Sequence, residues 1–325
     1  MRSLRFTVSA LLALSLGLGA AVAGAQEYPT HPIRLVLPQA PGAGSDLVGR
    51  MMAERMSQTL GQPVVVDNKP GANGILASTL VAKEPADGYT LLLTSVSLVS
   101  FNPFLYKNTS SDPIKDFTFI GPVADASFVL VASNASAIKT WADFVKRAKA
   151  KPDGITFASG GTGNSTHLYT EMIARRSGIA LRHIPYKSSG PALLSVVSGE
   201  TDVMVSTTAV ALPQIKAGKI AVLAQSGESR SPQLPDVPLL KELTPDVPPL
   251  PGWYAVVGPA GMDPKVVRKL SSALDSFLAD PVIKTKLSEQ FLFPIPGSSA
   301  DIKKRAETES KVWGGLIKDL KIEMD

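Results

Sequence analysis

Two glycine-rich segments, each lying between an apolar run and a helical pattern, constrain the fold of this chain more than any other feature. The first segment, residues 38–50, follows the apolar run 33–37 and leads into a helical repeat of Leu, Val and Met at 47–60. The second segment, residues 158–168, follows the short strand-like run 155–158 and precedes another helical pattern. Glycine permits positive φ and lets a ligand approach the main chain closely. Because free N–H groups at a helix start favour anions, the two segments predict two lobes that close on one small acid.

The first segment contains three polar residues with distinct expected roles. Ser45 is predicted to be the N-cap of the helix, where its hydroxyl accepts a hydrogen bond from a first-turn N–H. Asp46 falls in the first turn, where a negative charge is favourable, and Arg50 follows at the spacing of an intrahelical ion pair. Two roles therefore stay open for Asp46, a structural pair with Arg50 and a contact with the ligand.

The second segment is also rich in short polar side chains. Ser159, Thr162 and Asn164 could cap their own helix, but their clustering in a glycine-rich loop favours a binding role. His167 falls in the first turn of the following helix, where a protonated imidazole would oppose the helix dipole. We therefore expect His167 to be neutral, and to pack or form hydrogen bonds rather than act as a charged clamp.

From Ile33 onward, strand-like and helix-like stretches alternate almost without interruption. This alternation predicts parallel sheets covered by helices on both faces. The expected strands are residues 33–37, 64–66, 89–94, 117–123, 128–132, 155–158, 181–186, 202–206, 220–225 and 253–257.

The end of the chain predicts that the first lobe is discontinuous. A proline-rich segment at 231–251 indicates a long surface connection. The helical patterns that follow, at 264–278, 282–290 and 300–318, have no strands of their own, so we expect them to return to the first lobe. The predicted organisation is lobe 1 at 26–124, lobe 2 at 125–228, and lobe 1 again at 229–325.

Residues 1–25 have the pattern of a cleaved secretion signal. Arg2 and Arg5 precede an apolar core at 11–22, and Ala23-Gly24-Ala25 fits the small-residue cleavage rule. The alternative is a membrane anchor, but the apolar run is shorter than the roughly 20 residues that span a bilayer. We therefore expect export of a mature chain that begins at residue 26.

Composition and motifs argue against several classes of function. Loss of the two signal-peptide arginines lowers the net charge from +5 to +3, which is too mild to indicate nucleic-acid binding without a basic run. With no Cys, and no two of the three His at helical metal-ligand spacing, no metal or cofactor is expected. The chain lacks a Gly-x-Ser-x-Gly elbow and a Gly-Lys-Ser/Thr phosphate loop. No nucleophile with an orienting base is recognisable, so we expect a protein that is not an enzyme.

A series of short motifs runs in order along the mature chain. They include Pro41-Gly42 with Asp46 and Arg50, Asn68-Lys69-Pro70-Gly71-Ala72, Asp87-Gly88-Tyr89-Thr90, Ala158-Ser159 with His167-Leu168, Pro185-Tyr186-Lys187 and Leu234-Pro235-Asp236-Val237-Pro238. In this order the motifs resemble those of the tripartite tricarboxylate transporter substrate-binding proteins, the Bug family of periplasmic solute receptors.

The resemblance implies a two-lobed periplasmic binding protein type II fold of the α/β class, with parallel-rich sheets flanked by helices and hinge strands between the lobes. It also implies that the first strand–helix loop and its counterpart in lobe two hold the ligand's carboxylate, largely through backbone N–H groups and water. Three positions depart from the family pattern, so the identity of the acid is not carried over: Gln39, Ala43 and Ser188. The residues expected to bind the ligand are Gln39, Gly42, Ala43, Ser45, Asp46, Thr94, Ser97, Ser159, Gly161, Thr162, Gly163, Asn164, His167 and Ser206.

These observations predict an exported, monomeric receptor in the periplasm. It is expected to capture a small mono-, di- or tricarboxylate or an amphoteric acid between its lobes, for a two-component membrane transporter of the tripartite tricarboxylate type. Two alternatives stay open: a solute sensor that signals to a membrane protein, and a secreted α/β enzyme that acts on a small acid. The sequence carries no motif that separates transport from sensing.

Overall fold

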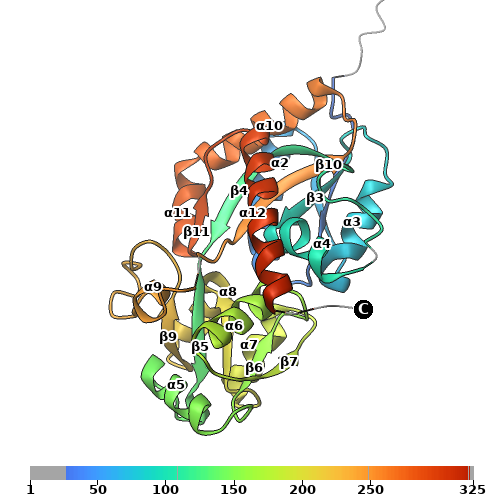
Figure 1. Ribbon diagram of the computed structural model, residues 1–325. Coiled ribbons are helices and arrows are strands. Elements are labelled where there is room, and N and C mark those ends of the chain that lie inside the picture. The colour runs from blue at the N-terminus through green and yellow to red at the C-terminus, as the bar shows by residue number, and fades with distance from the viewer. Residues whose placement is uncertain (1–26, 108, 248, 321, 323–325) are drawn as a thin grey trace, which may run out of the picture.

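A computed structural model of the chain describes residues 27–107, 109–247, 249–320 and 322, and Figure 1 shows its two lobes. The expected signal peptide at 1–25 lies outside these residues. Each lobe is built on one sheet with helices on both faces. Within the described part of the chain, no helix combines the length and the apolar character that a membrane span requires.

The first sheet has six strands in the order β11-β4-β10-β3-β1-β2. Its strands are β1 (Ile33–Leu37), β2 (Val64–Asn68), β3 (Thr90–Ser95), β4 (Phe117–Ala126), β10 (Trp253–Pro259) and β11 (Leu292–Pro294). One face packs against α2 (Gly44–Leu60), α10 (Pro264–Ala279) and α11 (Pro281–Glu289). The other face packs against α3 (Ile75–Ala82), the π-helical turn η2 (Ser97–Phe101), α4 (Asn102–Leu105) and α12 (Ser299–Leu320).

The second sheet has five strands in the order β7-β6-β8-β5-β9. Its strands are β5 (Phe128–Ser133), β6 (Thr156–Ser159), β7 (Arg182–Pro185), β8 (Val203–Thr207) and β9 (Ile220–Gln225). Helices α5 (Trp141–Ala150) and α6 (Ser165–Arg176) cover one face, and α7 (Ser189–Ser198) and α8 (Thr208–Lys216) cover the other. A capping box starts α5, because Thr140 and Asp143 exchange hydrogen bonds between side chain and backbone.

The sheets are mixed, whereas the alternation of strands and helices predicted parallel ones. The strand–helix–strand units are parallel, since β1 pairs in parallel with β2 and β3, and β6 with β7 and β8. Strand β10 is antiparallel to β3 and β4, and β5 is antiparallel to β8 and β9. Strand β5 follows the first crossing between the sheets, and β10 follows the return crossing. Each therefore starts at the junction of the sheets, whereas the parallel strands beside it end there.

The chain crosses between the sheets at two adjacent places. Only Ser127 separates β4 from β5, and β4 continues two residues past the lobe boundary expected at 124. The return crossing precedes β10, where the Gly252 carbonyl accepts a hydrogen bond of 3.1 Å from the Ala126 N–H. The lobe boundaries at 124/125 and 228/229 stay predictions, but the two crossings lie side by side.

Several short elements were not predicted from the sequence. Strand β11 adds an edge to the first sheet between α11 and α12, although the tail was expected to carry no strand. The proline-rich connection contains the single-turn helix α9 (Leu240–Leu243). The turns η2 and α4 were also missed. None of these elements is long enough to show a helical or alternating period.

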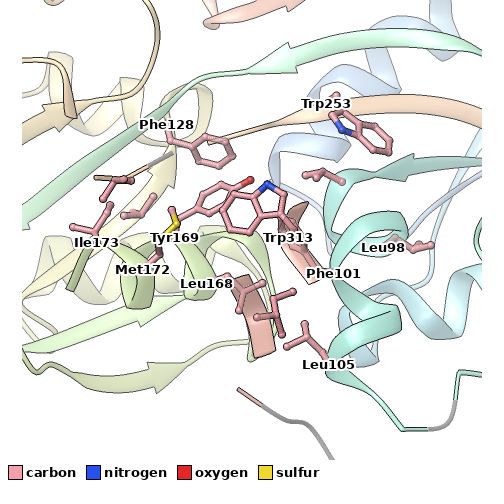
Figure 2. Packing of buried hydrophobic residues seen from close by; sticks show 14 of the residues in the cluster. Leu98, Phe101, Leu105, Phe128, Leu168, Tyr169, Met172, Ile173, Trp253 and Trp313 are labelled. Carbon is pink, nitrogen blue, oxygen red and sulfur yellow. The ribbon is translucent and has the colours of Figure 1, made fainter. Parts of the chain in front are cut away.

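An aromatic cluster joins the two lobes along the inner side of α12. Figure 2 shows Trp313 of α12 with Phe101 of the first lobe and with Tyr169 and Phe128 of the second. The ring centroids of Trp313 lie 4.9 Å from Phe101 and 5.3 Å from Tyr169, and Tyr169 lies 4.9 Å from Phe128. The apolar core is therefore continuous between the lobes at this side of the molecule.

Candidate functional site

The first glycine-rich loop ends in α2, which begins one residue earlier than the predicted cap. Ala43 is the N-cap and Gly44 the first helical residue, so Ser45 lies inside the first turn. The prediction that Ser45 caps the helix is therefore wrong. Its hydroxyl instead donates a hydrogen bond of 2.9 Å to Gln39 Oε1, which ties the start of the loop to the helix. No side chain caps the start of α2. Asp46, in the first turn, instead accepts a hydrogen bond from the Gly42 N–H of the loop.

Asp46 is 5% exposed and both its carboxylate oxygens are saturated. Oδ2 accepts hydrogen bonds of 3.0 Å from the Gly42 N–H and from Arg50 Nε, and Oδ1 contacts Asn68 Nδ2 at 3.1 Å and Arg50 Nη2 at 2.9 Å. Burial raises the pKa of Asp46, but these hydrogen bonds outweigh it and leave the pKa below its ordinary value. Of the two roles left open for Asp46, the geometry favours the structural one. Asn68 is a partner that the sequence did not reveal.

The start of α2 leaves two amide groups available. The Asp46 and Leu47 N–H groups donate to the Ala43 carbonyl, at 3.0 and 3.2 Å. The N–H groups of Gly44 and Ser45 have no acceptor among the described residues, as is usual for the first turn of a helix. Gly42 was expected to offer its amide to a ligand, but this N–H is taken by Asp46. The donors of the first loop are therefore Gly44 and Ser45.

The second glycine-rich loop satisfies most of its own hydrogen bonds. Asn164 caps α6 by accepting from the Thr166 N–H, and the Gly160 N–H donates to Thr166 Oγ1 at 2.9 Å. The Gly161 N–H donates to Ser159 Oγ at 3.2 Å, and the Gly163 N–H donates to His167 Nδ1 at 3.1 Å. The capping alternative is therefore correct for Asn164. Thr162 is half-buried at the turn of this loop.

Two histidines stack behind the second loop. The rings of His167 and His183 lie 3.9 Å apart at 15°, and Phe157 stacks on His183 at 4.7 Å. Burial, together with the neighbouring His183, lowers the pKa of His167 to about 3, and burial lowers the pKa of His183 to about 4. His167 Nδ1 also accepts the Gly163 N–H, which requires a ring nitrogen without a proton. His167 is therefore neutral at pH 7, in agreement with the prediction.

The histidine stack should make the protein less stable in mild acid. A histidine whose pKa is lower in the folded state than in the unfolded state contributes stability above pH 6.5, and this contribution is lost as the pH falls. For His167 we expect a loss of roughly 2 kcal/mol in the free energy of unfolding between pH 6.5 and 4.5. Urea unfolding at both pH values measures it. His167→Asn, which keeps an acceptor near the Nδ1 position, should remove the share of His167 and leave that of His183, and an unchanged slope would exclude His167 as a source.

Ser159 and His183 form a contact that the sequence did not predict. Ser159 Oγ lies 2.6 Å from His183 Nε2, so a hydroxyl and an imidazole are paired, contrary to the expectation that no such pair exists. Parallel pairing of β6 and β7 places Ser159 opposite Pro185, and His183 two residues back on the same side. The Ser159 side chain is completely buried, and no carboxylate is bonded to His183 within the described ranges. The pair thus lacks both the access and the orienting acid of a catalytic serine.

The two lobes meet where the carboxyl ends of their parallel strands face each other, which we call the interlobe junction. On the η2 side, Asn73 Nδ2 donates to the Gly163 carbonyl at 2.9 Å, and the Ser165 N–H donates to Ser97 Oγ at 3.2 Å. Ser97 was expected at the site, whereas Asn73 was missed. The second glycine-rich loop is therefore held against the first lobe. In open α/β sheets, ligands bind outside the carboxyl ends of the strands.

On the α2 side, the junction is formed by three residues that the sequence prediction did not include. A Cβ atom on Gly44 would lie 2.7 Å from the Tyr254 hydroxyl of β10 and 3.3 Å from Thr207 Oγ1 at the end of β8. Ser206 was expected here, but its hydroxyl donates to the Thr207 carbonyl at 3.1 Å. The position of Thr207 at a strand end was the signal available in the sequence. Nothing in the sequence indicated Tyr254, which is 210 residues from Gly44.

Thr94 lies on the opposite face of the first sheet from Tyr254. It pairs with Ala255 in the register of β3 and β10, whereas Tyr254 pairs with Ser95. The Thr94 side chain is 1% exposed, and Oγ1 has no hydrogen-bond partner among the described residues. A buried hydroxyl without a partner at a strand end is compatible with a ligand or a water molecule at the junction. In the described part of the chain, no group of three or more His, Asp or Glu side chains is placed to hold a metal ion.

Two α/β lobes joined by adjacent crossings, with polar loops and helix starts facing each other, define a two-lobed periplasmic binding protein. Residues 48–322 match the family described as tripartite tricarboxylate transporter family receptor, and the chain belongs to this family. This family and fold are those of solute-binding receptors rather than enzymes.

Solved structures support the same assignment. Rpa4515 of Rhodopseudomonas palustris, solved with adipate, is 29% identical with a TM-score of 0.88, and the match covers 91% of this chain and 99% of that one. The periplasmic binding protein BugD is 31% identical with a TM-score of 0.87, and the match covers 92% of this chain and 100% of BugD. MatC of Rhodopseudomonas palustris, solved with malate, is 26% identical with a TM-score of 0.84, with coverage of 89% and 100%. The two-lobed fold and the family resemblance predicted from the sequence are confirmed.

Proposed function

We propose that this protein binds one small carboxylic acid at the interlobe junction and delivers it to a two-component membrane transporter of the tripartite tricarboxylate type. The observation that carries the proposal is the start of α2, where the Gly44 and Ser45 amides are free donors at the positive end of a helix of 17 residues. Rpa4515 and MatC, which share the fold, were solved with adipate and malate. The free amide donors and the acids bound by the two relatives therefore both favour a carboxylate as the ligand.

Neutral donors explain why a carboxylate can bind without a cationic clamp. Arg50 is engaged with Asp46, so its charge is already compensated. A helix N-terminus carries about half a positive charge, and its amides are pre-oriented for an anion. The location in the periplasm after signal cleavage and the monomeric state are part of this proposal. So are the ligand-binding residues predicted from the sequence, except Gly42 and Asp46, whose polar groups are bonded to each other.

Native mass spectrometry of freshly purified protein tests the proposal. We expect a mass excess corresponding to one small molecule per chain, which denaturation releases as a carboxylic acid. Calorimetric titration of stripped protein with the released acid should then give one site per chain, and incubation should return the acid unchanged. Release of a compound without a carboxylate, or steady conversion of the bound acid, would contradict the proposal.

A further inference from the structure

The end of the second lobe that faces away from the interlobe junction is a surface of its own, which we call the distal pole. Strands β6, β7 and β8 start at this end and run toward the junction, whereas β5 ends here and β9 starts here. Figure 1 shows α5 at this end of the lobe. The distal pole consists of the four connections at this edge of the sheet with the adjoining helix ends: residues 134–155, 175–182, 199–202 and 216–219.

Hydrogen bonds join these connections into one surface. The Asp153 N–H donates to the Ala180 carbonyl at 3.2 Å, which links the first connection to the second. Asn134 Nδ2 donates to the Gly218 carbonyl at 2.9 Å, which links the first connection to the fourth. The third connection precedes β8, which lies between β6 and β5 in the sheet. Side chains of all four connections therefore contribute to the same end of the lobe.

The distal pole is strongly basic, although the protein as a whole is not. It contains ten Lys or Arg and four Asp or Glu, a net charge of +6, whereas residues 26–325 together carry +3. Two of the four acids are already engaged, Asp143 in the capping box of α5 and Asp202 with the N–H and the hydroxyl of Thr156. The ten basic residues are Lys139, Lys146, Arg147, Lys149, Lys151, Arg175, Arg176, Arg182, Lys216 and Lys219.

These cations are exposed and mostly without an anionic partner. All ten are exposed, and within the described ranges only Arg175 forms an ion pair, with Glu171 at 4.0 Å. A basic residue in the last turn of a helix stabilises that helix, which accounts for Arg175 and Arg176 in α6. Arg182 belongs to β7, and Lys219 lies in the loop before β9, so the helix dipole does not account for them. The positive charge of the pole therefore exceeds what the fold itself uses.

We propose that the distal pole docks on a bilayer that contains anionic phospholipids, with the lipid phosphates as the partners of its Lys and Arg side chains. Clusters of four to eight Lys or Arg are typical of surfaces that bind anionic lipids. A protein partner is less favoured, because protein interfaces usually have an apolar and aromatic core. The large apolar side chains that are exposed in the described part of the chain lie outside the pole: Val65, Leu76, Leu194, Val282, Phe293 and Val312.

Docking at the distal pole leaves the proposed acid site free. The pole and the interlobe junction lie at opposite ends of β6, β7 and β8, so a membrane at one end does not cover the other. The inference goes beyond the proposed function, because it concerns a second surface and a different partner. It places the receptor at the membrane before it meets the transporter.

Sedimentation of the purified mature protein with lipid vesicles tests the inference. Vesicles of phosphatidylcholine alone are compared with vesicles of phosphatidylcholine and phosphatidylglycerol in equal parts. We expect binding to the anionic vesicles only, because each Lys or Arg near such a surface strengthens attachment about fivefold. Raising the ionic strength from about 0.1 to about 1 M shortens the Debye length from about 10 to about 3 Å, and should release the protein.

A variant of the pole should lose this binding. The pole variant replaces four exposed cations: Lys149→Gln, Lys151→Gln, Arg176→Gln and Arg182→Gln. We expect its affinity for the anionic vesicles to fall more than about a hundredfold. Its affinity for adipate and malate should equal that of the wild type, because the substitutions are far from the junction and the fold is unchanged.

The matched control removes the same number of charges from the first lobe. It replaces four exposed lysines of α10 and α11: Lys265→Gln, Lys269→Gln, Lys284→Gln and Lys286→Gln. Both variants lower the net charge of residues 26–325 from +3 to −1, so only the location of the charge differs. The control should bind the anionic vesicles within about threefold of the wild type.

Three results would overturn the inference: unchanged vesicle binding by the pole variant, an equal loss in both variants, or equal binding of the wild type to vesicles of phosphatidylcholine alone. An equal loss in both variants would show that attachment follows the net charge of the protein. In each of these cases the proposed function stands, because it is measured separately by titration with the acids. If the wild type instead binds anionic vesicles through the pole but binds no acid, the proposed function fails and the inference stands.

Discussion

Gly44→Val should reduce carboxylate binding by more than about a hundredfold while leaving the protein folded. The added Cβ would lie 2.7 Å from the Tyr254 hydroxyl and 3.3 Å from Thr207 Oγ1, too close on both sides. Overpacking of this kind costs about 1–3 kcal/mol, and each lost hydrogen bond to a carboxylate costs a similar amount. Gly44 lies in a regular helix without positive φ, so its backbone accepts a side chain and the effect should appear in binding.

Calorimetric titration of Gly44→Val with adipate and malate measures this loss, and thermal unfolding shows whether the variant is folded. Gly315→Val is a suitable control, because Gly315 lies in α12 with nothing within 4 Å of its Cβ position. Normal affinity in a folded Gly44→Val protein would show that the start of α2 is not where the acid binds.

Gly42 and Gly163, both expected at the site, are less informative positions. Both have positive φ, +82° and +76°, so any side chain strains the backbone there. A Cβ on Gly42 meets nothing within 4 Å, whereas one on Gly163 would lie 3.0 Å from Leu105 across the junction. Substitutions at Gly163 therefore mix local strain with interference between the lobes, and those at Gly42 report mainly on strain.

Local units of this fold could be predicted from the sequence because their signals are local. The strand expected at 33–37 has the expected bounds, and the helix expected at 264–278 is observed at Pro264–Ala279, since apolar runs and helical repeats extend over their whole length. The capping box of Thr140 and Asp143 is another signal contained within one turn. Strand direction is not local, which is why the antiparallel pairing of β5 and β10 was missed.

Contacts within one loop could be predicted from the sequence, whereas contacts between the lobes were missed. Asp46 and Arg50 are one helical turn apart, so their ion pair follows from spacing. Thr207, Tyr254 and Asn73 reach the junction only because two sheets face each other, and no spacing rule connects them to Gly44 or Gly163. The contact between Ser159 and His183 likewise depends on the register of β6 and β7.

The C-terminal helix fixes how the two lobes are joined. Arg305 of α12 donates to both oxygens of Asp125 at the end of β4, at 2.7 and 3.1 Å. Trp253 Nε1, at the start of β10, donates to Glu309 Oε2 at 2.6 Å. These bonds attach α12 to both crossing strands, so its position does not depend on the aromatic cluster. Trp313 of α12 then contacts the second lobe through Tyr169.

Trp313→Ala should therefore weaken the coupling between the lobes in unfolding, while α12 stays attached to the crossing strands. Trp313 is 3% exposed, and loss of a buried tryptophan costs about 3–5 kcal/mol of unfolding free energy. The indole ring of Trp313 lies against both Phe101 and Tyr169, so its loss weakens the contact between the lobes. We therefore expect one calorimetric unfolding transition for the wild type and two for the variant.

The matched control is Trp141→Ala, which truncates a half-buried tryptophan whose ring contact, with Phe144 at 5.6 Å, lies within the second lobe. It should lower stability by less and keep one transition, since the junction is untouched. A Trp313→Ala protein that unfolds in one transition, with no greater loss than Trp141→Ala, would show that the aromatic cluster fills space without coupling the lobes. The crossing strands and the α12 ion pairs would then be the connection that unfolds last.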